Sequence, residues 1–461
     1  MAGIGFELRR LLRQDSYFSL LRAYGYAGLI SSGPWVLSIL AVMALGILSA
    51  AANPSNTTHV TAFLVSVTWL VAGSLLLTSL VQLLFTRFVA DRLFEKRDVT
   101  ILPNVMGLLT LVMLIAAAVG SALLWWTFGQ TPWLYQLEML VSFVALCMIW
   151  CVTVFVAGVK AYRQVLLAFA CGYGATFIGG VLLKDYGLEG LLGGFVIGQS
   201  LLLFMLLAMV IRHYPSDRLW DFELHRAGQC QRSLIAIGLF YQAGIWADKL
   251  VFWFNPATSE PIIGPLRASP IYDLPIFLAY LSIVPGMAVF IMRMETDFAE
   301  RCHAYYDAIR GGDTLGHIET LRGEMVASVR HGIYDIFKVQ GITVAGLLLS
   351  GPLLFSWLGF SHWYLPLFNI DIVAVGIQVL LMAILNVLFY LDRLKPALWL
   401  CLLFLLSNLI LTLLSQLLGP VFYGYGYALS LLFTTLVGLA VLDHEFEQLT
   451  YQTFMLQPSK G

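Results

Sequence analysis

The chain has 461 residues, of which 59% are hydrophobic and only 11% are charged. Soluble proteins usually carry about a quarter charged residues, so this composition excludes an ordinary water-soluble domain and predicts a surface that largely faces lipid. The formal net charge of −1 provides no basic field, and we expect no nucleic-acid partner.

The first apolar run, residues 23–50, follows four arginines in residues 1–22. It is far longer than the roughly 7–15 apolar residues of a secretory signal, so we interpret it as a first membrane span. In residues 1–22, apolar and basic side chains fall on different faces of a helix. This pattern predicts an interfacial N-terminal helix on the inner leaflet, with a simple basic flank as the alternative.

A helix that crosses a bilayer needs about 20 mostly apolar residues. Three prolines (Pro270, Pro275 and Pro285) interrupt the eighth candidate segment. We therefore expect an all-α polytopic membrane protein with about 12 transmembrane helices. The predicted spans lie near residues 23–50, 61–86, 104–128, 138–159, 164–183, 190–211, 233–254, 272–292, 336–358, 367–391, 397–418 and 424–442.

The basic residues are distributed unevenly between the two ends of these spans. If the N-terminus lies inside, all of the 26 Lys and Arg residues except Lys184, Lys249 and Arg267 fall in cytoplasmic stretches. Basic residues accumulate on the cytoplasmic side of membrane proteins, so both termini are expected in the cytoplasm.

The spans divide into two sets of six. We predict an N-terminal six-helix bundle (1–211), a basic cytoplasmic linker (212–232) and a C-terminal six-helix bundle (233–461). The second bundle contains a cytoplasmic loop at 293–335 and ends in a cytoplasmic tail. Two related bundles are a transporter architecture in which the substrate path runs along the interface between the halves.

A short motif repeats at the inner end of the second span of each half. Arg87 and Asp91 in the first half correspond to Arg293 and Asp297 in the second. The spacing of four residues places each pair on one helix face, where the side chains can form an ion pair. Together with the 6+6 pattern, the motif favours an internal duplication.

The loops argue against an enzyme that works on the outer face. All outer connections are short, whereas the largest loop, 293–335, is cytoplasmic. Residues 314–338 are predicted to form an amphipathic helix that lies on the membrane or contacts a cytoplasmic partner, with a solvated connector as the alternative.

No P-loop, zinc-protease, nucleophile-elbow or Cys-x-x-Cys motif is present in the sequence. We therefore expect neither catalysis nor a metal or cofactor. The remaining activity is movement of a substrate, driven by an ion gradient or by another protein.

Asp248 and Lys249 are the clearest intramembrane charges, about two-thirds of the way across span seven. Each such charge costs roughly 2.5–3.5 kcal/mol on insertion scales, which makes it a functional candidate. Adjacent residues point about 100° apart on a helix, so we expect Asp248 to lie with Tyr241 and Lys249 with Gln242 and Trp246, rather than facing each other. A water-filled substrate path is one interpretation. In the alternative, the lysine reaches the outer headgroups and the aspartate caps a neighbouring helix.

Other candidates for the substrate path lie near the outer face. Arg267, Tyr272 and Asp273 occur in a proline-rich segment that forms either the mouth of a cavity or a rigid loop. Glu138 and Asp371 open spans four and ten, where ordinary boundary charges are the alternative. Mixed charges surrounded by aromatic side chains suit a carbohydrate, because sugar C–H faces pack on aromatic rings while the hydroxyls need polar partners.

Span two carries Ser74, Thr78 and Gln82 at intervals of four residues. Small polar side chains in this pattern are typical of helix–helix packing, and we expect that role rather than a place in the path.

The words "MAGIGFELRRLL", "GYAGLISSGPWVLS" and "WADKLVFW" resemble the PelG family of Pel exopolysaccharide transporters, over essentially the full length. The resemblance implies a multi-pass flippase-like protein of the bacterial inner membrane, in the multidrug/oligosaccharidyl-lipid/polysaccharide flippase superfamily. It further implies export of an N-acetylgalactosamine- and galactosamine-rich biofilm polymer to the periplasm. The implied partners are a cytoplasmic glycosyltransferase and membrane subunits of a Pel-type synthase complex, one of them a cyclic-di-GMP receptor.

Two other functions remain open. An ion-coupled drug or metabolite exporter of the same fold would use an intramembrane carboxylate such as Asp248 and would need no partners. A non-transporting scaffold for a polysaccharide synthase would not need the intramembrane charges.

Overall fold

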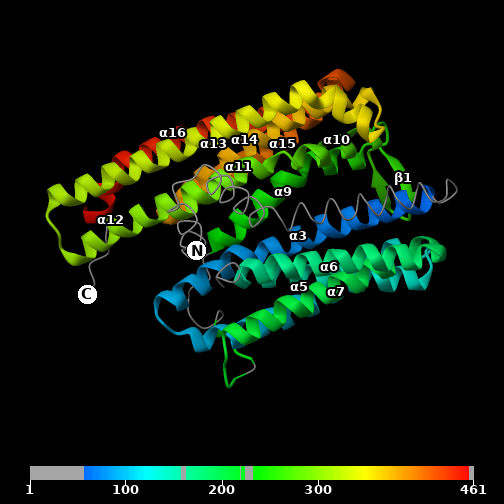
Figure 1. The fold of residues 1–461 in the computed structure, drawn as a ribbon, viewed down its shortest axis with the longest axis horizontal. Helices are drawn as coiled ribbons and strands as arrows, with labels where there is room; N and C mark the ends of the chain where they lie inside the picture. Colours follow the sequence, from blue (N-terminus) through cyan, green and yellow to red (C-terminus); the bar gives the residue numbers. More distant parts are fainter. Residues whose placement is uncertain (1–56, 157–161, 219, 224–231, 456–461) are drawn as a thin grey trace. The chain divides into compact units, whose positions relative to one another are not determined.

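The computed structural model consists almost entirely of long helices (Figure 1). The predicted N-terminal interfacial helix and the first predicted span lie outside the residues that the structure describes. The described residues form two compact units, each treated separately below: the N-unit (57–270) and the C-unit (271–455). The structure describes residues 57–156, 162–218, 220–223 and 232–455.

The N-unit contains six long helices and one short β-hairpin. Its elements are α3 (Thr57–Phe94), η2 (Asp98–Thr100), α4 (Ile101–Thr127), α5 (Trp133–Val156), α6 (Tyr162–Leu183), η3 (Lys184–Tyr186), α7 (Gly187–His213), α9 (Arg232–Phe254), β1 (Glu260–Ile263) and β2 (Leu266–Ala268).

The C-unit is helical throughout its described residues. Its elements are α10 (Pro270–Tyr280), α11 (Ile283–Phe290), the π-helical η4 (Ile291–Phe298), α12 (Ala299–Gly311), α13 (Leu315–Leu358), η5 (His362–Tyr364), α14 (Leu365–Tyr390), α15 (Leu394–Leu418), η6 (Pro420–Phe422) and α16 (Tyr425–Met455).

Ten described helical stretches are long and apolar enough to cross a membrane, and one of them, Gln164–His213, contains both α6 and α7. Each predicted span after the first therefore falls on a helix, which confirms an essentially all-α multi-pass membrane protein. The total of twelve stays a prediction because residues 23–50 are not described. The hairpin in residues 260–268 is the exception to the all-α expectation.

Close glycine packing joins α6 to α7, which lie side by side in Figure 1. A Cβ atom on Gly194 would lie 2.3 Å from the backbone nitrogen of Gly180, and one on Gly198 would lie 2.5 Å from the carbonyl oxygen of Gly172. Only glycine permits such close approach of two helix backbones. Small residues at four-residue intervals are a common solution where lipid supplies no hydrophobic drive for helix association.

Helix α3 packs against α5 and α9 in the N-unit. The hydroxyl of Ser74 accepts a hydrogen bond from Trp150 Nε1 at 3.0 Å, and Gln82 Nε2 donates to the carbonyl oxygen of Trp150 at 3.4 Å. The polar stripe of span two thus joins α3 to α5, which confirms its predicted packing role.

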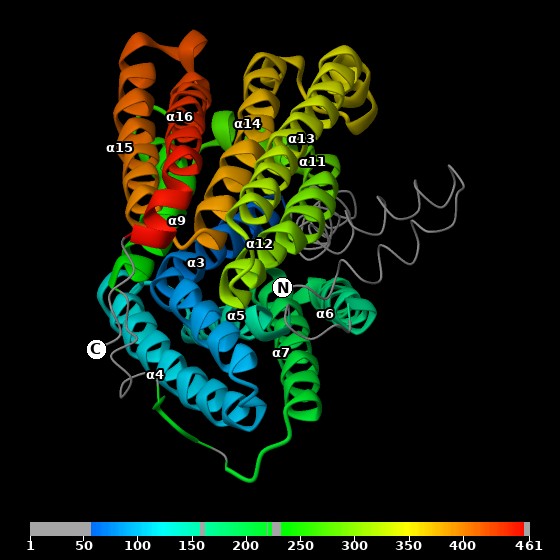
Figure 2. The same ribbon diagram turned by 90° about the vertical axis from the view of Figure 1, so that its left-hand side faces the viewer.

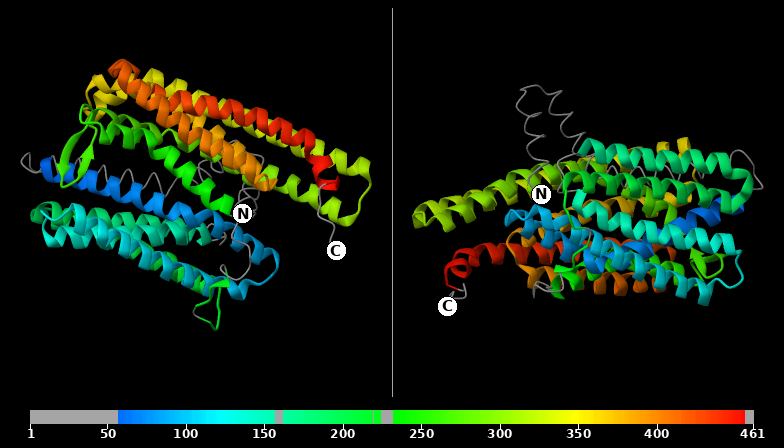
Figure 3. Two further views of the ribbon diagram at one scale, coloured as in Figure 1. Left: turned by 180° about the vertical axis from the view of Figure 1, so that it is seen from behind. Right: turned by 90° about the horizontal axis from the view of Figure 1, so that it is seen from below.

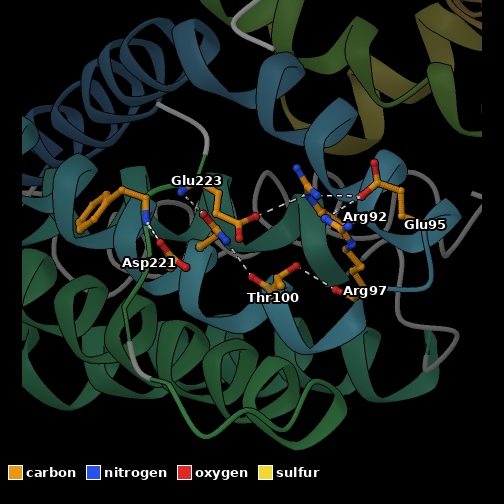
Figure 4. A network of polar contacts seen from close by, with 8 residues as sticks. Arg92, Glu95, Arg97, Thr100, Asp221 and Glu223 are labelled. Atoms are coloured by element: carbon orange, nitrogen blue, oxygen red, sulfur yellow. Dashed lines mark hydrogen bonds and ion pairs between the residues drawn. The ribbon is translucent and has the colours of Figure 1, made fainter. Parts of the chain in front are cut away.

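The described part of the 212–232 linker is fastened to the end of α3 and the start of α4 (Figure 4). The backbone N–H of Asp221 donates to the carbonyl oxygen of Pro103 at 3.1 Å, and that of Glu223 donates to Asn104 Oδ1 at 2.9 Å. Buried Arg92 lies 3.8 Å from the Glu223 carboxylate. This segment therefore belongs structurally to the N-unit.

The two R-x-x-x-D motifs form the predicted ion pairs. Arg87 lies 3.3 Å from Asp91 in α3, and Arg293 lies 2.9 Å from Asp297 in η4. The compact units divide at Pro270, so α9 groups with the N-unit, whereas the sequence-based division lies at 212–232. The two six-helix bundles and their duplication stay predictions.

Span eight is divided into α10, α11 and η4, with a turn at residues 281–282 shortly before Pro285. The predicted cytoplasmic loop at 293–335 is helical: α12 and the first half of α13 pack together after a turn at Gly312 (Figure 2). Arg322 donates to Thr450 Oγ1 at 3.1 Å, and Arg330 lies 3.2 Å from Asp443, so both side chains tie α13 to α16. The helix predicted at 314–338 is confirmed as the start of α13.

Helices α15 and α16 run beside each other in the C-unit (Figure 3). A Cβ on Gly426 would lie 2.5 Å from the Cα of Thr412, so the two backbones nearly touch. This packing again depends on a glycine at the crossing point.

Candidate functional site

Helix α9 lies directly on α3, and this position places its charged residues inside the N-unit. A Cβ on Gly238 would lie 2.3 Å from the carbonyl oxygen of Ser79, so glycine is required at the crossing. The six residues 244–249 are all buried, including Asp248 and Lys249. A helical segment buried on all sides cannot leave an isolated charge unbalanced.

Asp248 and Lys249 form a direct ion pair, so the expectation that their side chains diverge is wrong. Lys249 Nζ lies 3.1 Å from Asp248 Oδ2 and 3.3 Å from Oδ1, and it also donates to the carbonyl oxygen of Ile245 at 2.9 Å. The four-carbon lysine chain is long enough to fold back along the helix and overcome the 100° offset between neighbours. The lysine is 1% exposed, which also argues against its reaching the headgroups.

Three tryptophans form a chain of ring contacts, and one of them, Trp246, lies beside Lys249. Trp69 of α3 and Trp253 of α9 have ring centroids 4.7 Å apart, and Trp246 lies 6.0 Å from Trp253. Lys249 Nζ is 5.8 Å from the Trp246 ring centroid, within the range of a cation–π contact. Trp246 Nε1 is buried and has no hydrogen-bond partner among the described residues, which leaves a donor for a bound hydroxyl or water.

The hairpin holds the end of α9 through Arg267. Its Nε donates to the carbonyl oxygen of Trp253 at 3.1 Å and to Ser259 Oγ at 2.8 Å, and its Nη2 donates to the carbonyl oxygen of Ser259 at 2.9 Å. Trp69 Nε1 donates to the carbonyl oxygen of Arg267 at 2.8 Å. The guanidinium thus caps α9, and the backbone carbonyl of Arg267 holds the Trp69 indole. The segment that contains Arg267 is therefore a folded hairpin, and its place at the mouth of a cavity stays a prediction.

The other predicted path residues of the N-unit lie further from the pair along the chain. Tyr241 and Gln242 are half-buried on α9, about two turns before Asp248. Glu138 lies at the contact between α5 and α7, where its Oε1 would be 3.3 Å from a Cβ on Gly193. Glu138 is therefore not a fully solvated boundary charge.

The remaining predicted residues belong to the C-unit. Tyr272 is fully buried and Asp273 half-buried on α10. Asp371 on α14 is 0% exposed, and its Oδ1 would lie 3.2 Å from a Cβ on Gly424. Burial shows that Asp371 is not an ordinary boundary charge. A role of these residues in a path stays a prediction.

Sequence reasoning missed Trp69, which lies 198 residues from its partner Arg267. No local pattern could link the two, although an indole on a span that also carries small polar residues was a usable signal. It also missed Glu295. The sequence-based prediction placed this residue in the cytoplasmic loop, whereas in the structure it is buried beside Asn386 and Tyr390.

The arrangement combines aromatic faces, a buried unfilled donor and one balanced pair of charges. Whether this arrangement lines a substrate path stays a prediction.

The same fold occurs in solved membrane transporters. An outward-facing multidrug-resistance MATE transporter of the MOP superfamily is 14% identical to this chain and has a TM-score of 0.61. The match covers 98% of this chain and 99% of the transporter. A MATE protein in the straight conformation is 14% identical at the same coverage, also with a TM-score of 0.61. A MOP-superfamily transporter from Pyrococcus furiosus is 14% identical, again over 98% and 99%, with a TM-score of 0.60. The fold is therefore that of a MATE-like transporter.

The family can be stated more closely. The model of the family described as "PelG: Putative exopolysaccharide Exporter (EPS-E)" matches residues 1–454. The chain belongs to the PelG family. A comparison with curated proteins finds no match.

Proposed function

We propose that this protein exports an (N-acetyl)galactosamine-rich exopolysaccharide from the cytoplasm to the periplasm across the bacterial inner membrane. Membership of a family of exopolysaccharide exporters and the MATE-like transporter fold support export as the activity. The polymer class, the membrane and coupling to a glycosyltransferase in a Pel-type synthase complex are the further parts of the proposal.

The observation that carries the proposal is the tryptophan cluster that meets the Asp248–Lys249 pair through Trp246. Carbohydrates pack their C–H faces on aromatic rings, and their hydroxyl, acetamido and amino groups need polar partners. Trp246 offers an unfilled N–H donor, and the ion pair offers a carboxylate and an ammonium without a net charge. A site of this composition can release its substrate, because no single strong charge holds it.

Polymer export by cells that carry Asp248→Asn with Lys249→Met tests this role. The double substitution removes both charges together and avoids leaving one buried charge alone. We expect export to fall at least tenfold while protein level and assembly with partner subunits stay normal. The matched control is Asp307→Asn with Arg310→Met, an exposed pair on α12 at 2.7 Å, which should export normally.

The rival functions predict other outcomes. Normal export by the double variant and by Trp246→Ala would exclude this site from the path and favour a scaffold. Export of cationic drugs by the wild-type protein without any synthase subunit would favour an ion-coupled drug exporter.

A further inference from the structure

Glu295 is a buried carboxylate held between two helices of the C-unit. It is 6% exposed and lies in the π-helical segment η4. Its Oε1 accepts a hydrogen bond from Asn386 Nδ2 at 2.8 Å, and its Oε2 accepts one from the Tyr390 hydroxyl at 3.1 Å. Both donors come from the last two turns of α14, so this carboxylate is a direct link between η4 and α14.

Both hydrogen-bond donors are neutral. Within the described part of the chain, no cation lies at ion-pair distance from Glu295. The nearby Arg293 directs its guanidinium to Asp297 at 2.9 Å and to Asp335 at 2.8 Å. A buried carboxylate whose described hydrogen-bond donors are all neutral is costly to keep charged, and such groups in membrane proteins generally serve ion or proton movement.

The backbone around Glu295 is unusual. Eight residues, Ile291–Phe298, form a π-helix, and Thr296 Oγ1 donates to the carbonyl oxygen of Ile291, five residues earlier, at 3.3 Å. π-Helical turns are rare and are frequently found at functional sites. The segment follows a helix that is already broken at residues 281–282. Glu295 is thus placed on an irregular segment rather than on a uniform helix.

The Asn386 side chain can serve both protonation states of Glu295. Its Nδ2 donates to the carboxylate, while its Oδ1 is buried and has no hydrogen-bond partner among the described residues. A protonated carboxyl carries one O–H donor and needs an acceptor. A half-turn of the Asn386 amide brings Oδ1 to that position, so a proton bound at Glu295 has a ready acceptor.

We propose that Glu295 is a proton-binding site through which export is coupled to a proton gradient. A proton added to the carboxylate forms a neutral carboxyl, and its release restores the charge, so no other reactant is needed. Among the described residues, the titratable and charged groups around Glu295 are Asp297 and Arg293 on η4, Asp335 on α13, Tyr390 on α14 and buried Cys302 on α12; α11 contributes none. The positive amino terminus of the chain also acts on the carboxylate electrostatically. Asp297 and Asp335 are 38% and 30% exposed, and they offer a route for protons between solvent and the site.

Proton binding alters the contact between η4 and α14. The charged form accepts two hydrogen bonds from α14, whereas the neutral form donates one and retains a weaker acceptor. A ligand shifts a conformational equilibrium only if it binds the two states differently, and this change of hydrogen bonding provides such a difference.

Infrared titration of the purified full-length protein in lipid nanodiscs tests the assignment. The C=O band of protonated carboxyls is followed from about pH 5 to 9, the range in which buried carboxyls titrate. We expect a titrating component in the wild type that is absent from Glu295→Gln and present in the control Glu300→Gln, which alters an exposed acid on α12. An identical titration of wild type and Glu295→Gln would overturn the proposal. So would a C=O band whose intensity changes when sodium is added at constant pH.

Tyr390→Phe provides a second measurement that does not depend on folding of the glutamine variant. It removes a donor that stabilises the charged form more than the neutral form, so the proton affinity of the site should rise by about tenfold, as expected for loss of a hydrogen bond to a charged group. An unchanged titration would also overturn the proposal. Because no polymer is present, these outcomes are independent of the export assay above.

Discussion

The N-unit and the C-unit each bury an acidic side chain, but they stabilise it differently. Asp248 is paired with the cation Lys249, its neighbour in sequence. Among the described residues, Glu295 receives hydrogen bonds only from the neutral Asn386 and Tyr390. The first carboxylate has a cation as its partner, whereas the second is the proposed proton-binding site. Equal burial therefore does not imply an equal role.

The largest effect is expected from breaking the fixed pair on one side only. Lys249→Met leaves the Asp248 carboxylate buried without its partner, and loss of one member of a buried pair costs about 3–5 kcal/mol. The free energy of unfolding in mixed micelles measures this loss. Adding Asp248→Asn should restore most of the stability, because an amide needs no cation.

Arg310→Met provides the control for that measurement. Arg310 also forms an ion pair, with Asp307 at 2.7 Å, but on an exposed face of α12. We expect a cost below about 1 kcal/mol, as for surface ion pairs in general. If Lys249→Met lost as little stability as Arg310→Met, burial of the Asp248–Lys249 pair would not make its loss costly.

A smaller effect is expected from separating α9 from α3. Gly238→Ala places a Cβ 2.3 Å from the carbonyl oxygen of Ser79, a backbone atom that cannot move without shifting α3. Overpacking of this kind costs about 1–3 kcal/mol. The displacement should also disturb the tryptophan cluster, which near-ultraviolet circular dichroism reports.

The matched variant is Gly323→Ala on α13, where no atom lies within 4 Å of the added Cβ. Alanine is a better helix former than glycine by about 0.5–1 kcal/mol, so this variant should be neutral or stabilising. Equal behaviour of the two alanine variants would contradict the close contact of α9 with α3.

The amino-acid sequence determined the membrane spans well because hydropathy is a local property. It also supplied the two R-x-x-x-D pairs, since residues four apart on a helix meet regardless of tertiary structure. It failed where contacts are distant: Trp69 meets Arg267 across 198 residues, and Glu295 meets Asn386 across 91. The Asp248–Lys249 geometry was missed for a different reason. The 100° offset describes the backbone alone, and the flexible lysine side chain is long enough to span it.

Trp69→Phe tests the N-unit site and should cause a modest loss in the free energy of unfolding. The phenyl ring keeps the stacking on Trp253 but removes the N–H that donates to the carbonyl oxygen of Arg267 at 2.8 Å. One hydrogen bond contributes about 0.5–1.5 kcal/mol to stability. Trp399→Phe, at a position that is 69% exposed on α15, should change nothing measurable. A larger loss at Trp399 than at Trp69 would show that the indole is not the link between α3 and the hairpin.

The smallest effect is expected for Glu295→Gln, and its size is the sharpest test of the comparison. Glutamine retains an oxygen for Asn386 Nδ2, and the Tyr390 hydroxyl can turn to accept from the new amide, so Glu295→Gln should alter the free energy of unfolding by less than about 1 kcal/mol. Glu295→Leu should cost about 1–3 kcal/mol, because it leaves both α14 donors without an acceptor. A site that had relied on a fixed negative charge would lose similar stability in both variants. A mild glutamine variant beside a costly leucine variant is therefore the pattern of a carboxyl that the fold already accommodates in its neutral form.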